Sequence, residues 1–181
     1  MTLTSEKAYA LYPITEENAA TTVPHMLELI KALAIYEKEP LSSVEATEDL
    51  LHKALFGDAT KGGRKYCECV LAYAGGEPGS PGSSPVGMAV YFYTFSTWTG
   101  RGGLYLEDLF VTEQMRGKGV GKALFGYLGK LCQQLELPRM DWVVLDWNVD
   151  AQEVYRRMGA VHKKEWFGMR LQDEPLAKLA Q

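Results

Sequence analysis

Apolar residues recur along the chain with two different periods, and each period predicts a different kind of element. Helical spacing of leucine, isoleucine and alanine, with polar residues between them, is typical of amphipathic helices. We expect Thr22 and Thr47 to cap the first two helices and Pro24 to lie in the first turn. The helical pattern predicts helices over residues 23–37, 48–56, 120–135 and 151–158.

Segments rich in β-branched and aromatic residues lie between the predicted helices. Residues 66–74 and 86–95 form an expected hairpin, and residues 103–111 an expected central strand, because both of its faces are largely apolar. A buried strand over 140–147 and a last strand over 165–171 complete the pattern. In the central strand, alternation places Leu104, Leu106, Asp108 and Phe110 on one face, and Tyr105, Glu107, Leu109 and Val111 on the other.

Helical and strand-like segments are mixed along the chain, which is typical of an α/β or α+β layer fold. The 181 residues suit a single domain spanning residues 1–181. Residues 75–85, between the hairpin strands, are Gly, Pro or Ser at every position except Glu77. Such a stretch buries too little apolar surface to offset its ordering entropy, so we expect a flexible insertion.

Charge and cysteine content narrow the classes of function. Nineteen Lys and Arg against 23 Asp and Glu give a net charge of −4, which argues against a protein that neutralises a nucleic-acid backbone. Three cysteines, an odd number, favour reduced thiols and a cytoplasmic location. No long apolar run and no secretion signal pattern is present, so no membrane association is expected. The histidines lack ligand-like spacing with Cys67 and Cys69, so no metal is expected.

The most specific feature is a glycine-rich turn over residues 116–122, between the central strand and a long helix. Glycines leave backbone N–H groups accessible, and a helix N-terminus adds partial positive charge, so the turn suits a pyrophosphate. The alternative is a plain glycine-rich connection. Arg116, Lys122 and Ala123 stand where the common ATP- and dinucleotide-binding loops require other residues, so neither ATP hydrolysis nor NAD binding is expected.

Two motifs resemble the GCN5-related N-acetyltransferase (GNAT) family. The strand LYLEDLFV, followed four residues later by RGKGVG, resembles the acetyl-CoA-binding signature R-x-x-G-x-G/A, with Arg116, Gly119 and Gly121 at its fixed positions. The stretch from WNVDA to VYRRMGA, residues 147–160, resembles the family's second block. The segment LIKALAIYE at 29–37 resembles the start of the diamine (spermidine/spermine) acetyltransferase branch.

The resemblance implies a single GNAT-type domain, with a twisted, mixed and mostly antiparallel sheet that is flanked by helices and split at a central bulged strand. It implies acetyl-CoA as cosubstrate and a homodimer as the assembly. Leu109, Phe110 and Val111 would hold pantetheine through main-chain bonds, and Asn148 and Ala151 would flank the cofactor's other side. The pyrophosphate would be held by Arg116, Gly117, Lys118, Gly119, Val120, Gly121 and Lys122.

Amide formation requires a neutral amine, whereas an alkylammonium resembles lysine, with a pKa of about 10.4. Glu107 is the candidate base, acting directly or through a water; the alternative is a carboxylate that only binds substrate or a structural partner. A backbone N–H near Leu109 would stabilise the oxyanion. Tyr155 matches the family's general acid for the CoA thiolate, although its ring alternatively only packs against the cofactor. No cysteine shows the pattern of an activated nucleophile, so direct transfer in a ternary complex is expected.

Acidic and aromatic positions suggest the class of acceptor. Carboxylates spaced along a site attract a molecule whose ammonium groups are spaced in the same way. Ser96 stands where the diamine branch has an acidic residue, and residues 167–169 replace its Glu-Gly-Trp. We expect a small diamine or polyamine as acceptor. The alternatives are thialysine or lysine-like amines, a protein amine, or a non-catalytic acetyl-CoA-binding module. The resemblance to the diamine branch implies that the residues that bind the acceptor are Tyr36, Glu37, Trp98, Glu107 and Asp108.

Overall fold

A computed structural model describes residues 8–180 of the chain, and contacts within it divide the chain into two compact units. The first unit ends at Trp142, and the second begins at Val143. The expectation of one domain with a flexible insertion at 75–85 stays a prediction.

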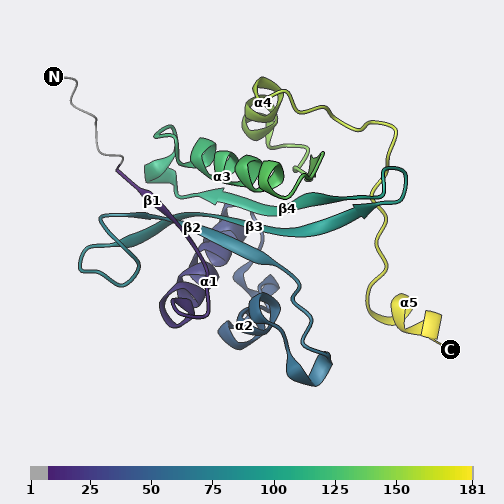
Figure 1. Cartoon of the computed structure of the whole chain (residues 1–181), viewed down its shortest axis with the longest axis horizontal. Helices are drawn as coiled ribbons and strands as arrows, with labels where there is room; N and C mark the ends of the chain where they lie inside the picture. The colour runs from purple at the N-terminus through teal and green to yellow at the C-terminus, as the bar shows by residue number, and fades with distance from the viewer. Residues whose placement is uncertain (1–7, 181) are drawn as a thin grey trace. The chain divides into compact units, whose positions relative to one another are not determined.

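The first unit is built on a five-stranded sheet whose strands lie side by side in chain order (Figure 1). Neighbouring strands are antiparallel, except that the last two run parallel. The predicted hairpin is confirmed, and so is a mixed, mostly antiparallel sheet. The strands are β1 (Ala10–Pro13), β2 (Glu68–Ala74), β3 (Ser84–Ser96), β4 (Arg101–Val111) and β5 (Met140–Asp141).

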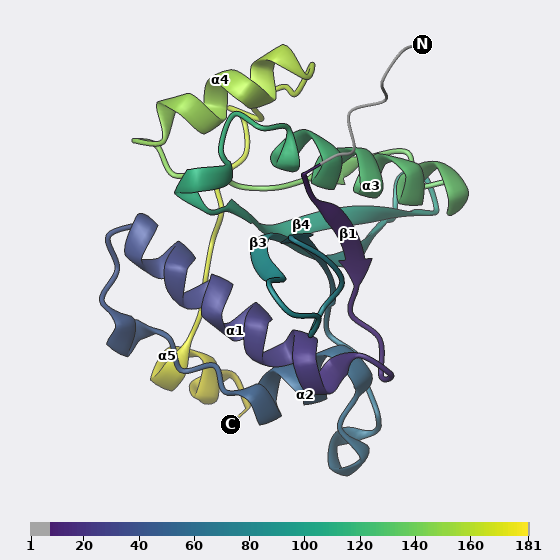
Figure 2. The same ribbon diagram turned by 90° about the vertical axis from the view of Figure 1, so that its left-hand side faces the viewer.

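Helices cover both faces of this sheet, with α1 (Ala19–Tyr36) and α2 (Glu48–Phe56) on one side and α3 (Val120–Gln134) on the other (Figure 2). Each interface encloses its own apolar core. Met26, Leu71 and Met88 belong to the core under α1, and Leu104 and Leu124 to the core under α3. Short 3₁₀ turns lie at Leu41–Ser43, Ala59–Lys61 and Glu113–Met115.

The first helix begins four residues earlier than the sequence predicts. Asn18 takes the N-cap position, whereas Thr22 lies fully buried inside the helix, so its predicted capping role is wrong. The Thr22 hydroxyl lies 3.0 Å from the Asn18 carbonyl oxygen and is thereby satisfied one turn back. Pro24 consequently lies beyond the first turn. The Thr47 cap is confirmed, since its Oγ1 accepts a hydrogen bond from Leu50 N at 3.3 Å.

A β-bulge interrupts the central strand. Val90 of β3 pairs with Asp108 of β4, but the next residue, Tyr91, pairs with Leu106, so Glu107 has no partner on β3. The extra residue reverses the alternation of side chains beyond it. Leu104 and Leu106 pack in the core under α3, whereas Phe110 packs in the core under α1. The predicted common face for these residues is therefore wrong, while the predicted bulge is confirmed.

The second unit contains α4 (Val149–Arg157), α5 (Asp173–Ala177) and a 3₁₀ turn at Lys178–Ala180. None of residues 143–180 is buried. The predicted helix at 151–158 is confirmed with slightly different bounds.

Two predicted strands near the C-terminal end are wrong. The strand expected over 140–147 is limited to Met140–Asp141, and Val143, Val144 and Leu145 are exposed. Residues 165–171 form no strand, and all of them are exposed. An apolar, β-branched stretch becomes a strand only when a neighbouring strand pairs with its backbone. Apart from the two-residue pairing of β5, these segments have no such neighbour within the described residues.

Candidate active site

Three carboxylates gather where the bulge of β4 meets the end of α1. Glu107 is the exposed bulge residue, Asp108 follows it half-buried, and Glu37 is the C-cap residue of α1. Burial, and then the charges of Glu107 and Glu37, raise the pKa of Asp108 to about 6. Burial, with a smaller contribution from Glu39, also raises the pKa of Glu37. The structure thus brings together three of the predicted acceptor-binding residues. Their neighbouring carboxylates form an acidic group that attracts a cation.

The cysteines near this acidic group are unsuited to nucleophilic catalysis. All three cysteines are free thiols. Burial, with the charges of Glu68 and Glu107, raises the pKa of Cys67 to about 11, and burial raises that of Cys69 well above its usual range. Only the thiolate is an effective nucleophile. The raised pKa values therefore make Cys67 and Cys69 poor nucleophiles near neutral pH.

The glycine-rich turn forms the start of α3, as predicted. Gly117 and Gly119 have φ angles of +74° and +86°, a region that residues with a side chain rarely adopt. The backbone N–H groups of residues 119–122 make no hydrogen bond to any described residue, as expected for the first turn of a helix. With the partial positive charge of the helix terminus, these amides fit a pyrophosphate.

The side chains of this turn divide between the core and solvent. Val120 is buried in the core under α3, so only its backbone is available to a ligand. Lys118 and Lys122 are exposed at either side of it. Two flexible cations beside free amides add to the attraction for phosphate groups.

The outer edge of β4 is open next to the bulge. β4 pairs with β5 only at Leu104 and Tyr105, and no strand in the described chain pairs with the rest of that edge. Leu109, Phe110 and Val111 lie on this open part. The Phe110 side chain is buried in the core under α1, so its contribution to a ligand is limited to the main chain. This opening matches the split sheet that the sequence predicts.

Arg116 connects the glycine-rich turn to two other elements. Its Nε donates a hydrogen bond to the Val111 carbonyl oxygen at 3.1 Å. Its guanidinium carbon lies 4.3 Å from the ring centroid of Tyr36 and 5.9 Å from that of Phe110. Tyr36, which the sequence assigns to the acceptor, therefore contacts the cofactor side of the predicted site.

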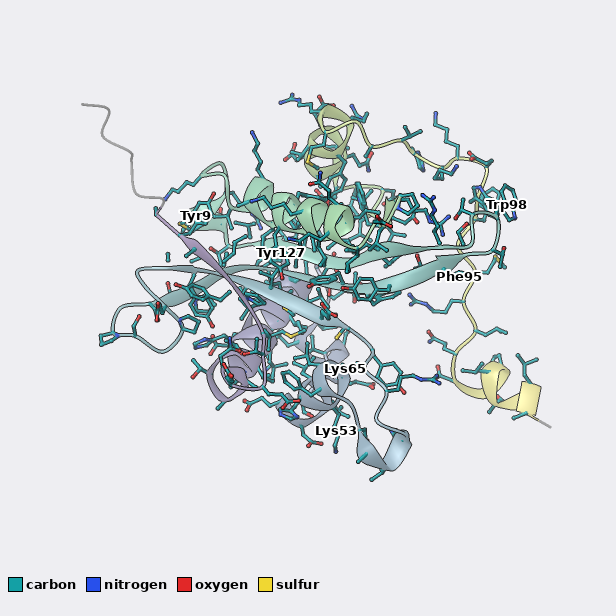
Figure 3. The ribbon with its side chains drawn as sticks, in the orientation of Figure 1. Tyr9, Lys53, Lys65, Phe95, Trp98 and Tyr127 are labelled. Atoms are coloured by element: carbon teal, nitrogen blue, oxygen red, sulfur yellow. The ribbon has the colours of Figure 1, made fainter. Side chains whose placement is uncertain are left out.

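Trp98 lies apart from the other predicted acceptor-binding residues of the first unit. It occupies the turn between β3 and β4, where 91% of its surface is exposed (Figure 3). Six residues of extended strand separate Arg101 from the bulge at Glu107, a span of about 20 Å. Within one chain, the structure does not bring Trp98 to the acidic group.

The predicted residues of the second unit share one helix. The Asn148 Oδ1 accepts a hydrogen bond from Ala151 N at 3.3 Å and so caps α4. Tyr155 lies on the same helix, four residues beyond Ala151. This cap stabilises the first turn of α4, and the predicted general acid lies in the following turn of the same helix.

One residue near the glycine-rich turn was missed by sequence reasoning. A Cβ on Gly119 would lie 3.3 Å from the Tyr9 hydroxyl, which makes no hydrogen bond to another described residue (Figure 3). Tyr9 precedes the short strand β1 and is more than 100 residues from the turn, so no local pattern in the sequence links the two.

The described residues lack two other kinds of feature. No group of three His, Cys, Asp or Glu side chains there is placed to hold a metal ion. No helix there has the length and apolar character needed to cross a membrane.

The match to a known family model establishes the protein family of this chain. The model of the Acetyltransferase (GNAT) family matches residues 30–160, which include the bulged strand, the glycine-rich turn and α4. The chain belongs to the GNAT family of acetyltransferases. GNAT acetyltransferases use acetyl-CoA as the acetyl donor. The chain is an N-acetyltransferase, and the resemblance of its two motifs is confirmed.

Similar proteins share this family. The chain is 34% identical to a thialysine N-epsilon-acetyltransferase of Bos taurus over 165 residues, covering 86% of this chain and 90% of that one. It is 32% identical to the protein of the same name in Sus scrofa over 160 residues, with the same coverage. An L-ornithine N5-acetyltransferase of Arabidopsis thaliana is 38% identical over 90 residues, which cover 50% of this chain and 40% of that protein.

Solved structures confirm the fold. An integron cassette protein from the V. cholerae mobile metagenome superimposes with a TM-score of 0.72 at 22% identity, covering 96% of this chain and 98% of its own. An aminoglycoside acetyltransferase from a soil metagenome gives a TM-score of 0.69 at 16% identity, covering 91% of this chain and 97% of its own. The mixed sheet flanked by helices is thus the GNAT fold.

Proposed function

We propose that this GNAT protein transfers the acetyl group of acetyl-CoA to a primary amine of a small diamino compound, in one step within a ternary complex. The observation that carries this proposal is the acidic group of Glu37, Glu107 and Asp108 at the bulge of β4. The same strand leads, through the 3₁₀ turn at Glu113–Met115, into the turn that fits a pyrophosphate. Donor and acceptor are therefore held by consecutive parts of one strand.

Acetyl-CoA is held mainly by backbone groups in this proposal. The amides at the start of α3, with Arg116, Lys118 and Lys122, bind the pyrophosphate and neighbouring phosphate. Main-chain groups of Leu109, Phe110 and Val111 on the open edge of β4 bind pantetheine. Asn148 and Ala151 at the start of α4 contact the cofactor's other side.

Chemistry begins with an ammonium group, which must lose a proton before it can attack. Glu107 accepts this proton, directly or through a water, and Asp108 and Glu37 favour the charged second amine of the same acceptor. The neutral nitrogen lone pair then forms the new bond to the thioester carbonyl carbon. A backbone N–H near Leu109 stabilises the resulting oxyanion.

Collapse of the tetrahedral intermediate breaks the carbon–sulfur bond and releases CoA as a thiolate. Tyr155 donates its phenolic proton to that sulfur and is reprotonated by the second proton that the nitrogen loses as the amide forms. The first proton, taken from the ammonium, leaves through Glu107 to solvent. The products are the acetylated amine and CoA thiol. No bond to the protein forms at any step, in line with the raised thiol pKa values of Cys67 and Cys69.

The acceptor we favour is an amino acid with a side-chain amine. Several relatives are named for thialysine and one for L-ornithine, and both compounds carry a primary amine on a short side chain. A diamine or polyamine is the second candidate. The acidic group suits it, and a human relative named spermidine/spermine N(1)-acetyltransferase-like protein 1 is 31% identical over 160 residues, which cover 87% of this chain and 22% of that protein.

Initial rates separate the two acceptor classes. Acetylated products are quantified by chromatography with thialysine, lysine, ornithine, putrescine, spermidine and a lysine peptide at varied acetyl-CoA. We expect the highest kcat/KM with thialysine or ornithine, and rate plots whose lines intersect, because both substrates bind before transfer. Higher kcat/KM for the polyamines would replace the favoured acceptor, and parallel lines would contradict the ternary complex.

A homodimer is the assembly we propose. Within residues 143–180 no side chain is buried, and Val161, Trp166, Phe167 and Met169 are each at least two-thirds exposed. Apolar side chains exposed in such density are typical of an interface rather than of a free surface. A second copy of the chain is the occupant that the resemblance to the diamine branch implies.

A further inference from the structure

The guanidinium of Arg116 is held on two sides by its own chain. One edge is fixed where Nε donates to the Val111 carbonyl oxygen at the end of β4. One face is covered by the Tyr36 ring, at 4.3 Å from the guanidinium carbon to the ring centroid. A planar cation at this distance from an aromatic ring is attracted to the ring's negative face.

These two contacts leave the terminal nitrogens of Arg116 available. Neither makes a hydrogen bond or ion pair with any described residue. Their in-plane N–H groups form the fork that binds two phosphate oxygens at once. A guanidinium whose plane is already fixed loses less conformational entropy when it binds such an anion.

Resting on the acetyl-CoA site proposed above, we propose that Tyr36 is a positioning residue for the cofactor. Its ring holds the Arg116 guanidinium in the plane from which the terminal nitrogens bind the pyrophosphate. Tyr36 then acts on acetyl-CoA through Arg116, and its aromatic ring, rather than its hydroxyl, carries the effect. The sequence assigns Tyr36 to the acceptor instead. The positioning role predicts a change in the KM for acetyl-CoA, whereas the acceptor role predicts a change in the KM for the amine.

This role ties the cofactor to the acceptor-binding end of α1. Tyr36 is the last residue of α1, and the next residue, Glu37, contributes to the acidic group around Asp108. A single helix end therefore carries one residue for each substrate. Substitutions at the two positions are expected to have different effects. A change at Tyr36 weakens the binding of acetyl-CoA, and a change at Glu37 weakens the binding of the amine.

Calorimetric titration of acetyl-CoA into four proteins tests this role: the wild type, Tyr36→Phe, Tyr36→Leu and Arg116→Gln. Tyr36→Phe retains the ring and is expected to bind like the wild type. Tyr36→Leu is expected to weaken binding about three- to tenfold, the range of a cation–π contact at a partly exposed site. The KM for acetyl-CoA should rise in parallel, while the KM for the amine stays unchanged.

A double variant shows whether Tyr36 acts through Arg116. In the Arg116→Gln background, Tyr36→Leu is expected to have no further effect on binding, because the partner it positions is gone. An equal loss in both backgrounds would overturn the proposal, as would unchanged binding by Tyr36→Leu or a rise confined to the KM of the amine. Thermal unfolding of each variant identifies any loss that comes from unfolding, and Tyr36→Phe then decides between ring and hydroxyl.

The acetyl-CoA binding data distinguish the role of Tyr36 from the proposed function of the whole protein. If the wild type binds acetyl-CoA and Arg116→Gln binds it as tightly, the roles of Arg116 and Tyr36 in cofactor binding are overturned, while the proposed acetyl transfer stands. If the wild type does not bind acetyl-CoA at all, both proposals are overturned.

Discussion

We expect substitution of Tyr155 to separate catalysis from cofactor binding. The Tyr155→Phe variant keeps the ring and loses only the proton that the proposed mechanism gives to the CoA thiolate. We expect kcat to fall about 10²-fold, within the usual contribution of general acid catalysis. Steady-state kinetics with calorimetric titration of acetyl-CoA checks this, and the affinity should stay unchanged. A variant with full kcat would show that the phenol only packs against the cofactor.

Asp108 makes stability depend on pH in a definite direction. Its pKa is raised to about 6 in the folded protein, against about 3.9 in an unfolded chain. Between these values the folded state holds a proton that the unfolded state has released, so stability falls as pH rises through this window. The destabilising effect of the charged form is complete above pH 6 and absent below about pH 4.

Asp108→Asn removes this charge without changing the size of the side chain. We expect the variant to be more stable than the wild type at pH 8, by on the order of 1–2 kcal/mol, and equal to it at pH 4. Denaturant unfolding at the two pH values measures the difference. Glu77→Gln, at an exposed loop position, is the matched control and should have no effect. A difference between wild type and Asp108→Asn that is independent of pH would contradict the assigned titration.

Glu37, Glu107 and Asp108 were selected from the sequence by their resemblance to positions of the diamine branch, and the structure places these three carboxylates near one another. The contact between Arg116 and Tyr36 was not predictable, because it joins residues 80 positions apart through the packing of α1 against β4. Side-chain pairs of this kind depend on the tertiary fold, and no local sequence pattern predicts them.

The start of α3 is the element to which we assign the pyrophosphate of the cofactor. Gly119 has a φ of +86°, and a Cβ there would lie 3.3 Å from the Tyr9 hydroxyl. Gly119→Ala is therefore expected to reduce the free energy of unfolding by about 1 kcal/mol. We expect acetyl-CoA affinity to fall by about tenfold, because the strained turn would no longer present its amides in the same place.

Gly126 offers a control within the same helix. It lies in the middle of α3, where an added Cβ would meet no atom within 4 Å. Gly126→Ala is expected to stabilise the protein by about 0.5–1 kcal/mol and to leave acetyl-CoA affinity unchanged. Chemical denaturation and titration of acetyl-CoA are measured for both variants. Equal losses of affinity would contradict a specific role for the turn.

Elements were predictable to the extent that their signals are local. The helical period located α1, α2, α3 and α4, since a helix satisfies its hydrogen bonds within its own segment. The bulge at Glu107 is visible only in the register with β3, so strict alternation placed Phe110 on the wrong face. The strands expected at 140–147 and 165–171 failed because a strand also needs a neighbour to pair with.

The proposed dimer predicts the mass of the assembly in solution. The apolar side chains of residues 143–180 should be covered by a second copy, so light scattering should give roughly twice the 20.2-kDa mass of one chain. Phe167→Glu places a charge among them and is expected to shift the protein towards the monomer. Leu50→Glu, at an exposed apolar position on α2, is the control and should leave the mass unchanged. A monomeric wild type would contradict the dimer.

Transfer of an acetyl group from acetyl-CoA to a small amine at the acidic bulge is the activity that we propose for this chain. Its most direct test is mass detection of the product after incubation with isotopically labelled acetyl-CoA and thialysine or ornithine. We predict an acetylated amine that carries the label, formed by the wild type and by Gly126→Ala, and strongly reduced in Tyr155→Phe and Glu107→Gln. Unlabelled or absent product with every small amine, from a protein that still binds acetyl-CoA, would contradict the claim.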